Sequence, residues 1–137
     1  MDSGKQNVVS VKGLCKSYNM GEIEINVLND ITFDIHKGDI VSIIGPSGVG
    51  KSTLLNILGT LDKPTAGNVY IDSEDVTEFN EDKLAHFRNK KIGFVFQFYH
   101  LLPELRVLEN VLLPQMVRTS VLRWIKERKA ARASPRP

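Results

Sequence analysis

Hydrophobic and polar positions alternate in two early segments of the chain, as expected for strands with one buried face. Residues 8–14, VVSVKGL, show this alternation, and residues 24–35, EINVLNDITFDI, place Ile31, Phe33 and Ile35 on one side. The first segment predicts a half-buried strand, and the second predicts an edge strand or a hairpin. Together they indicate an antiparallel β layer near the start of the chain.

Two other segments are apolar without alternation, which is typical of central strands that are covered on both faces. Residues 39–44, DIVSII, lie between Gly38 and Gly45, and residues 92–97, IGFVFQ, are rich in β-branched and aromatic side chains. Because helical segments separate these two strands, the sequence predicts a parallel sheet beside the antiparallel layer. A further short strand is expected at residues 67–72.

Three segments have the periodicity of helices. Leucine and isoleucine recur at helical spacing over residues 54–61, directly after a glycine-rich stretch. Residues 80–90 predict a polar helix with Asn80 as its N-cap. Residues 106–113 place apolar side chains on one helical face, and Pro114 is expected to interrupt that helix. The order around the glycine-rich stretch is therefore strand, loop, helix.

Composition places the chain among soluble globular proteins, with 42% hydrophobic and 25% charged residues in 137. Its apolar runs are too short to span a bilayer, and its first residues lack the pattern of a signal peptide, so we expect a cytoplasmic protein. The net charge of +2 hides an uneven distribution. Residues 118–137 carry seven basic groups and one acidic group, whereas the first 117 residues carry 11 basic and 15 acidic groups.

The glycine-rich stretch, GPSGVGKS at residues 45–52, matches the pattern G-x-x-x-x-G-K-[ST] between a strand and a helix. Gly48 and Gly50 allow the backbone to turn N–H groups toward a phosphate chain, and the following helix adds its positive end. Lys51 is predicted to reach the β and γ phosphates, and Ser52 to place its hydroxyl on Mg²⁺. The alternative is a glycine-rich turn whose lysine is merely solvated. The predicted phosphate-binding set is Gly45, Pro46, Ser47, Gly48, Val49, Gly50, Lys51, Ser52 and Thr53.

On these residues the sequence resembles the ATP-binding subunits of ABC transporters. GPSGVGKSTLLNILGTLDKPTAGNVYID is similar to the family's Walker A segment and the turn after it, LCKSY to its A-loop, and FVFQFYHLLPELRVLENVLLP to its Q-loop. Within the family, the Q-F-x-H-L-L-P-E form is most similar to the ATPases of bacterial lipoprotein-releasing systems. The resemblance covers residues 8 to about 117. It implies an α/β fold of the P-loop NTPase class, ABC ATPase type, with an N-terminal antiparallel β layer and without the C-terminal part of the domain.

The resemblance also implies the cofactors ATP and Mg²⁺ and two further site residues. Tyr18 would stack on the adenine, although it can also be read as an ordinary aromatic at a strand end. Gln97 would contact Mg²⁺ together with Ser52 and lie at the surface that couples to the membrane subunit, although it can also simply end a buried strand. The loop after Gln97 is unusually apolar and either docks a membrane-subunit helix or packs locally. Its apolar residues are Phe98, Tyr99, Leu101 and Leu102.

Parts of the family's hydrolytic machinery are not found within these 137 residues. No aspartate follows Asp82, no glycine follows Gly93 and no histidine follows His100. By the resemblance, this leaves out the Walker B strand, the LSGGQ signature and the switch histidine, so we predict no catalytic residue and expect the chain alone not to hydrolyse ATP. The predicted division is a partial ATP-binding domain at 1–117 and a basic tail outside the family pattern at 118–137.

The resemblance implies a complete protein that forms a homodimer and drives membrane-spanning transporter subunits from the inner face of the inner membrane, in lipoprotein release. The alternatives are an ABC exporter of antibiotics or peptides, a nucleotide-binding module without turnover, and a P-loop kinase, which the N-terminal β layer disfavours. The basic tail is read as an amphipathic helix on an anionic membrane, a segment attracted to nucleic acid, or an abnormal chain end. No specific nucleic-acid partner is predicted.

Overall fold

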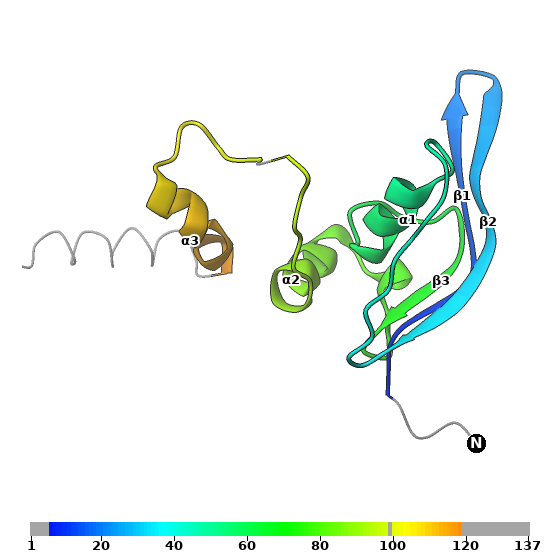
Figure 1. Ribbon diagram of the computed structural model, residues 1–137, viewed down its shortest axis with the longest axis horizontal. Helices are drawn as coiled ribbons and strands as arrows, with labels where there is room; N and C mark the ends of the chain where they lie inside the picture. Colours follow the sequence, from blue (N-terminus) through cyan, green and yellow to red (C-terminus); the bar gives the residue numbers. More distant parts are fainter. Residues whose placement is uncertain (1–5, 99, 119–137) are drawn as a thin grey trace, which may run out of the picture. The chain divides into compact units, whose positions relative to one another are not determined.

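A computed structural model of the chain describes residues 6–98 and 100–118. Tyr99 and residues 119–137, which include nearly all of the predicted basic tail, lie outside the described residues. The chain divides into two compact units between Leu84 and Ala85. The elements in chain order are β1 (Asn7–Met20), β2 (Ile23–His36), α1 (Lys51–Leu58), β3 (Ala66–Ile71), β4 (Glu74–Asp75), a 3₁₀ turn (Val76–Glu78), α2 (Glu81–Lys91) and α3 (Val107–Arg118). Figure 1 labels all of them except β4 and the 3₁₀ turn.

The first unit is built on an antiparallel sheet with the strand order β2-β1-β3-β4. β1 and β2 form a long hairpin, with β2 at the edge of the sheet, and α1 lies beside the sheet (Figure 1). Ile31, Phe33 and Ile35 are half-buried while Thr32 and Asp34 between them are exposed. The antiparallel layer, its edge strand and the apolar face of that strand are therefore confirmed.

A small hydrophobic core joins the sheet to α1. Val11, Leu14 and Val69 are fully buried, and Ile57 of α1 is nearly so. Each such side chain contributes about 1.5–3 kcal/mol by leaving water. Because Leu54 and Ile57 face this core, α1 is fixed against the strands and the loop before it has a rigid support. The other buried apolar residues described in this unit are Leu28, Leu54, Ile71, Val76, Phe79 and Leu84.

A β-bulge in β1 sets which side chains enter this core. Lys12 pairs with Asn68 and Cys15 pairs with Ala66, so two residues of β1, Gly13 and Leu14, lie opposite one residue of β3. In a regular strand, residues three apart point to opposite faces. The extra residue brings Leu14 to the same buried side as Val11, which lies three positions earlier.

Both predicted central strands are wrong in the described structure. Residues 39–44 and 92–97 belong to no sheet there, and Ile40 has 98% of its surface exposed. The predicted parallel sheet is therefore not formed within the described residues. An apolar run shows only that a segment suits two covered faces, whereas a strand also requires backbone partners on its sides. In the second unit, Phe94 and Phe96 stack on each other instead, with 5.4 Å between ring centroids.

The predicted helices are present with one difference. Asn80 accepts a hydrogen bond from the N–H of Lys83 at 2.9 Å and caps α2 as expected. The expected end at Pro114 is wrong, because α3 continues to Arg118. A proline removes one N–H from a helix, and α3 is nevertheless helical on both sides of Pro114. The carbonyl oxygen of Pro114 accepts a hydrogen bond from the side-chain amide of Asn89 in α2 at 3.0 Å. No helix in the described ranges has the length and apolar character that a bilayer crossing requires.

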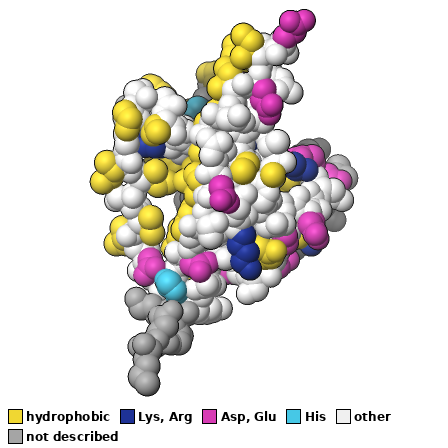
Figure 2. Space-filling view, turned by 90° about the vertical axis from the view of Figure 1, so that its right-hand side faces the viewer, with side chains coloured by type: hydrophobic (Ala, Val, Ile, Leu, Met, Phe, Trp, Pro, Cys, Tyr) yellow, Lys and Arg dark blue, Asp and Glu magenta, His cyan; other side chains and the backbone are white. Residues whose placement is uncertain are grey.

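Hydrophobic side chains also remain on the surface, as Figure 2 shows in yellow. At the turn of the β1–β2 hairpin, Met20 and Ile23 expose about two thirds of their surface, 68% and 67%. In the second unit, Leu101 and Leu102 are exposed beside Val107 of α3. In the apolar loop after Gln97, Phe98, Leu101 and Leu102 are thus exposed, and Tyr99 lies outside the described residues.

Candidate functional site

The loop at residues 45–50 takes its shape from two glycines in the left-handed region. Gly48 has φ +80° and Gly50 has φ +97°. At Gly50 a Cβ atom would lie 2.9 Å from Leu28 Cδ2 and 3.0 Å from the carbonyl oxygen of Val27, both in β2. This position therefore requires glycine for its backbone angle and for the close approach to the sheet. Both glycines thus hold backbone angles that other residues rarely adopt, and their role beside a phosphate chain stays a prediction.

The N-terminus of α1 follows this loop and is not capped by any side chain. Leu54 donates its N–H to the carbonyl of Gly50 at 2.9 Å, which is the first bond of the helix. The N–H groups of Lys51, Ser52 and Thr53 therefore have no acceptor within the helix. No acidic side chain occupies the first turn. Three N–H donors and the positive end of the helix dipole are available for an anion here.

Lys51 folds back over the loop. Its Nζ donates to the carbonyl oxygens of Gly45 at 2.9 Å and Pro46 at 2.6 Å. Anionic oxygens form stronger hydrogen bonds with an ammonium group than neutral carbonyls do, so a bound phosphate chain can take over these donors. Among the remaining predicted residues, Ser47, Val49 and Ser52 are exposed and Thr53 is half-buried.

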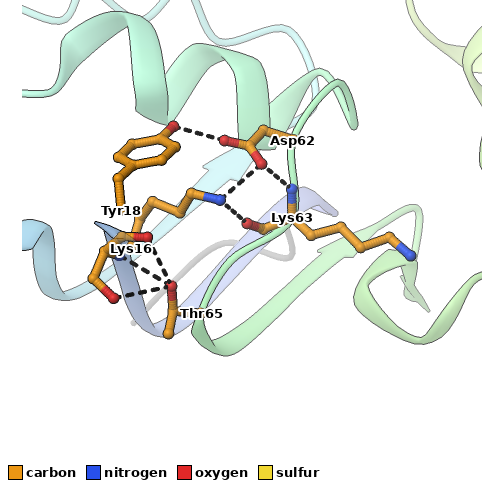
Figure 3. A network of polar contacts seen from close by, with 6 residues as sticks. Lys16, Tyr18, Asp62, Lys63 and Thr65 are labelled. Atoms are coloured by element: carbon orange, nitrogen blue, oxygen red, sulfur yellow. Dashed lines mark hydrogen bonds and ion pairs between the residues drawn. The ribbon is translucent and has the colours of Figure 1, made fainter. Parts of the chain in front are cut away.

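Tyr18 lies on β1, paired with Ile25 of β2, with 40% of its surface exposed. Its hydroxyl donates to Asp62 Oδ2 at 2.7 Å, as Figure 3 shows. Thr53 of α1 is also within interaction range of this hydroxyl. The structure thus brings Tyr18 beside the helix that begins at the glycine-rich loop.

Sequence reasoning missed the residues that surround Tyr18. Lys16 Nζ lies 2.7 Å from Asp62 Oδ1 and 2.7 Å from the carbonyl oxygen of Lys63 (Figure 3). Thr65 accepts a hydrogen bond from the N–H of Ser17 at 3.0 Å. The acidic residue in the turn after α1 was visible in the sequence, but nothing in the sequence connected it with a strand more than forty residues earlier.

This network shifts the pKa of Tyr18 and the pKa of Asp62, the two groups joined by the hydrogen bond from the phenol to the carboxylate. The pKa of Tyr18 is raised above 10.0, first because its hydroxyl donates to Asp62 and second because of partial burial. For Asp62, burial acts to raise the pKa, but hydrogen bonds from Lys16, Tyr18 and the N–H of Lys63 outweigh it, and the pKa is lowered below 3.8. At neutral pH the phenol is therefore neutral and the carboxylate ionised.

We expect the free energy of unfolding to fall in acid as Asp62 and Asp75 become protonated. The pKa of Asp75 is also lowered below 3.8, where burial is outweighed by hydrogen bonds from Thr77 and Asn68. A carboxyl group whose pKa is lowered by folding stabilises the fold at pH values above its pKa in the unfolded chain. This stabilisation is lost as the pH falls through the pKa of the group in the folded protein. Urea unfolding between pH 5 and pH 2 measures the free energy of unfolding at each pH. In Asp62→Asn this free energy should fall less steeply with decreasing pH, from about pH 4 downward. An unchanged slope in that variant would contradict the assignment.

Gln97, the other predicted Mg²⁺ ligand, belongs to the second unit, whereas Ser52 belongs to the first. Gln97 is exposed and follows the stacked pair of Phe94 and Phe96, and the ring of His100 contacts that of Phe96 edge-on at 4.7 Å. In the residues that the structure describes, no group of three or more His, Cys, Asp or Glu side chains could hold a metal. Few protein ligands suffice for Mg²⁺ bound with a phosphate chain, because it retains water and takes phosphate oxygens. The exposed Ser52 hydroxyl suits that arrangement.

Comparison with known proteins matches this chain to one family. The family model described as ABC transporter matches residues 28–136. The predicted division at residue 117, between a partial ATP-binding domain and a basic tail, stays a prediction. The lipoprotein-releasing system ATP-binding protein LolD of Idiomarina loihiensis is 50% identical over 106 residues, which cover 77% of this chain and 46% of that protein. An uncharacterized ABC transporter ATP-binding protein of Methanocaldococcus jannaschii, MJ0796, is 50% identical over 107 residues, which cover 78% of this chain and 46% of that protein. The chain thus spans about half the length of the curated relatives it matches.

Solved structures support the same conclusion about the fold. The dimeric structure of a post-hydrolysis state of the ATP-binding cassette MJ0796, bound to ADP and Pi, aligns with a TM-score of 0.77 at 49% identity. The alignment covers 82% of this chain and 48% of that chain. The expected fold, an α/β P-loop NTPase of the ABC ATPase type with an antiparallel β layer, is confirmed by this likeness. The chain belongs to the ABC transporter family.

Proposed function

We propose that this chain binds ATP with Mg²⁺ through the loop and helix start at residues 45–53. The observation that carries the proposal is the glycine-shaped loop joined to an uncapped helix N-terminus, with Lys51 poised on two loop carbonyls. A triphosphate carries several negative charges, and this arrangement supplies N–H donors, a helix dipole and an ammonium group at one place. The MJ0796 cassette, which is similar over most of this chain, was solved with ADP and Pi.

Each residue of the site has a distinct role in this proposal. The N–H groups at the start of α1 bind the phosphate oxygens, and Lys51 exchanges its carbonyl partners for the β and γ phosphates. Ser52 and Gln97 hold Mg²⁺, which would neutralise part of the phosphate charge. The exposed ring of Tyr18 stacks on the adenine. A flat aromatic ring stacked on the base excludes water from one face of that base.

For the complete protein we propose an ATP-binding subunit that acts as a homodimer on membrane-spanning transporter subunits in lipoprotein release, at the inner face of the inner membrane. Several relatives at about 50% identity bear the name of the lipoprotein-releasing system, while others are uncharacterized ABC transporter ATP-binding proteins. The exposed Phe98, Leu101 and Leu102 after Gln97 suit contact with an apolar helix of such a subunit. Co-purification with the membrane subunits of a lipoprotein-releasing system, rather than with those of an antibiotic or peptide exporter, is the result that supports this assignment.

A second candidate for these 137 residues is nucleotide binding without turnover. It is favoured by the sequence, in which no aspartate follows Asp82, so that no Asp-Glu pair ends a later apolar strand. Hydrolysis requires a carboxylate that positions the attacking water and a second hold on Mg²⁺. The two candidates agree on ATP binding and differ only in phosphate release.

We therefore expect the purified chain to bind ATP and to release no phosphate above the uncatalysed rate. Isothermal titration with ATP, in Mg²⁺ and again in EDTA, measures binding, and a phosphate-release assay on the same preparation measures turnover. Stronger binding in Mg²⁺ than in EDTA is expected, because Ser52 can then act through the ion. Absence of ATP binding under both conditions would contradict the proposed function, and phosphate release by the chain alone would contradict the candidate without turnover.

A further inference from the structure

Two charged side chains hold the exposed Tyr18 ring in one orientation. Asp62 Oδ2 accepts the phenolic proton at 2.7 Å and fixes the tip of the ring. The ammonium group of Lys16 lies 4.7 Å from the ring centroid and covers one face (Figure 3). A cation over an aromatic face is attracted by the ring electrons. The ring is therefore held at its tip and on one face while 40% of its surface stays exposed.

These two charged groups also hold each other. Lys16 Nζ lies 2.7 Å from Asp62 Oδ1, and only 12% of the Lys16 side chain and 29% of the Asp62 side chain are exposed. Lys16 also donates to the carbonyl oxygen of Lys63 at 2.7 Å, and Asp62 Oδ1 accepts the N–H of Lys63 at 2.7 Å. Both carboxylate oxygens are thus engaged, so Asp62 cannot rotate away from Tyr18 without breaking several charged hydrogen bonds.

The contact between Tyr18 and Asp62 is not needed to attach this turn to β1. Thr65 donates its N–H to the carbonyl of Cys15 at 2.9 Å and accepts the N–H of Ser17 at 3.0 Å. These bonds join the same two segments without involving the ring. The hydrogen bond that the phenol donates to Asp62 therefore has a separate effect, which is to restrict how the ring is oriented.

We propose that Asp62 is a positioning residue for nucleotide binding, which with Lys16 holds the Tyr18 ring ready to stack on the base of ATP. This inference rests on the proposed function. A free surface tyrosine loses rotational freedom when a base stacks on it, whereas a ring that is already fixed does not. With Lys16 on one face, a base can approach the exposed remainder of the ring. Asp62 thus favours nucleotides over bare polyphosphate, although it lies outside the glycine-rich loop.

The test compares two ligands by isothermal titration of the full chain: ATP and inorganic tripolyphosphate, each with Mg²⁺. Tyr18→Phe keeps the ring and removes only its hydroxyl, and Asp62→Ala removes the acceptor. Both variants should bind ATP about tenfold more weakly, because the ring is then no longer fixed in advance and must be ordered when the base stacks on it. Their affinity for tripolyphosphate should stay within about twofold of the wild type, because no base contacts the ring.

Two further variants separate positioning from a general loss of structure. Asp62→Asn keeps a side-chain oxygen for the phenol and should recover most of the ATP affinity that Asp62→Ala loses. Thr65→Val is the matched control, since it removes a hydrogen bond between the same two segments without contact with the Tyr18 ring, and it should bind both ligands normally. If Asp62→Ala fails to fold, Tyr18→Phe provides the same test.

A second readout follows the Tyr18 hydroxyl directly by NMR of ¹³C-labelled tyrosine during an alkaline titration. Loss of the Asp62 acceptor should lower the pKa of Tyr18 toward its ordinary value of 10.0. ATP binding at wild-type affinity by both Tyr18→Phe and Asp62→Ala, while Lys51→Ala abolishes binding, would overturn the positioning role and leave the proposed function intact. Failure of the wild type to bind either ligand would overturn the proposed function itself, and this inference with it.

Discussion

Lys51→Ala is expected to weaken ATP binding by at least about 100-fold, because two charge-assisted hydrogen bonds to the phosphates are lost together. In the structure the Lys51 ammonium group already lies over the loop, held by Gly45 and Pro46. It needs only to exchange carbonyl oxygens for phosphate oxygens. Isothermal titration with ATP measures the loss, and the same variant should also lose tripolyphosphate, since the lysine contacts phosphate and not the base.

Lys37→Ala is the matched control for this variant. It removes an exposed lysine from the same unit, outside the glycine-rich loop, and lowers the net charge by the same amount. Normal ATP affinity in Lys37→Ala shows that the loss in Lys51→Ala is local and not an effect of total charge. Unchanged ATP affinity in Lys51→Ala would refute the phosphate-binding role of the loop.

Gly67→Ala is expected to lower the free energy of unfolding by about 2–5 kcal/mol, the largest effect on stability that we expect from one added methyl group. At this position φ is +83°, and a Cβ atom would lie 2.2 Å from the carbonyl oxygen of Gly13 and 2.6 Å from that of Lys12. Both contacts are with backbone that is part of the bulge in β1, so no side chain can turn away to make room. Urea unfolding followed by far-UV circular dichroism measures the change.

Gly38→Ala separates the two causes of that effect. Gly38 has φ +88°, close to that of Gly67, but a Cβ atom there would have nothing within 4 Å. It should therefore show only the cost of the left-handed backbone, about 1–2 kcal/mol. Equal destabilisation by the two variants would mean that the approach of β3 to β1 at the bulge is looser than the structure indicates.

Local patterns in the sequence were sufficient for the elements that depend on neighbouring residues. Alternation identified β1 and β2, helical spacing identified α1 and α3, and Asn80 identified the start of α2. The same holds for the glycine-rich loop, whose left-handed residues follow from the pattern of glycines around Lys51. These features are decided by backbone angles, capping and the period of apolar positions, all of which act over a few residues.

Prediction failed where the outcome depends on partners far along the chain. The apolar segments at 39–44 and 92–97 have the composition of central strands, but a strand forms only where another strand offers its backbone groups. The continuation of α3 past Pro114 is a different kind of error, because a proline inside a helix removes one N–H without always ending the helix. Composition indicates what a segment can do and not which neighbours it has.

The family resemblance, the antiparallel layer and the loop whose glycines and lysine suit a phosphate chain could all be inferred from the amino-acid sequence. The folded structure was needed to see that Asp62 and Lys16 hold the Tyr18 ring, and that a bulge at Gly13 brings Leu14 into the core. The physical reason is the range of the interactions. Turns, caps and helix starts are set by adjacent residues, whereas a hydrogen bond between positions 18 and 62 exists only after the chain has folded.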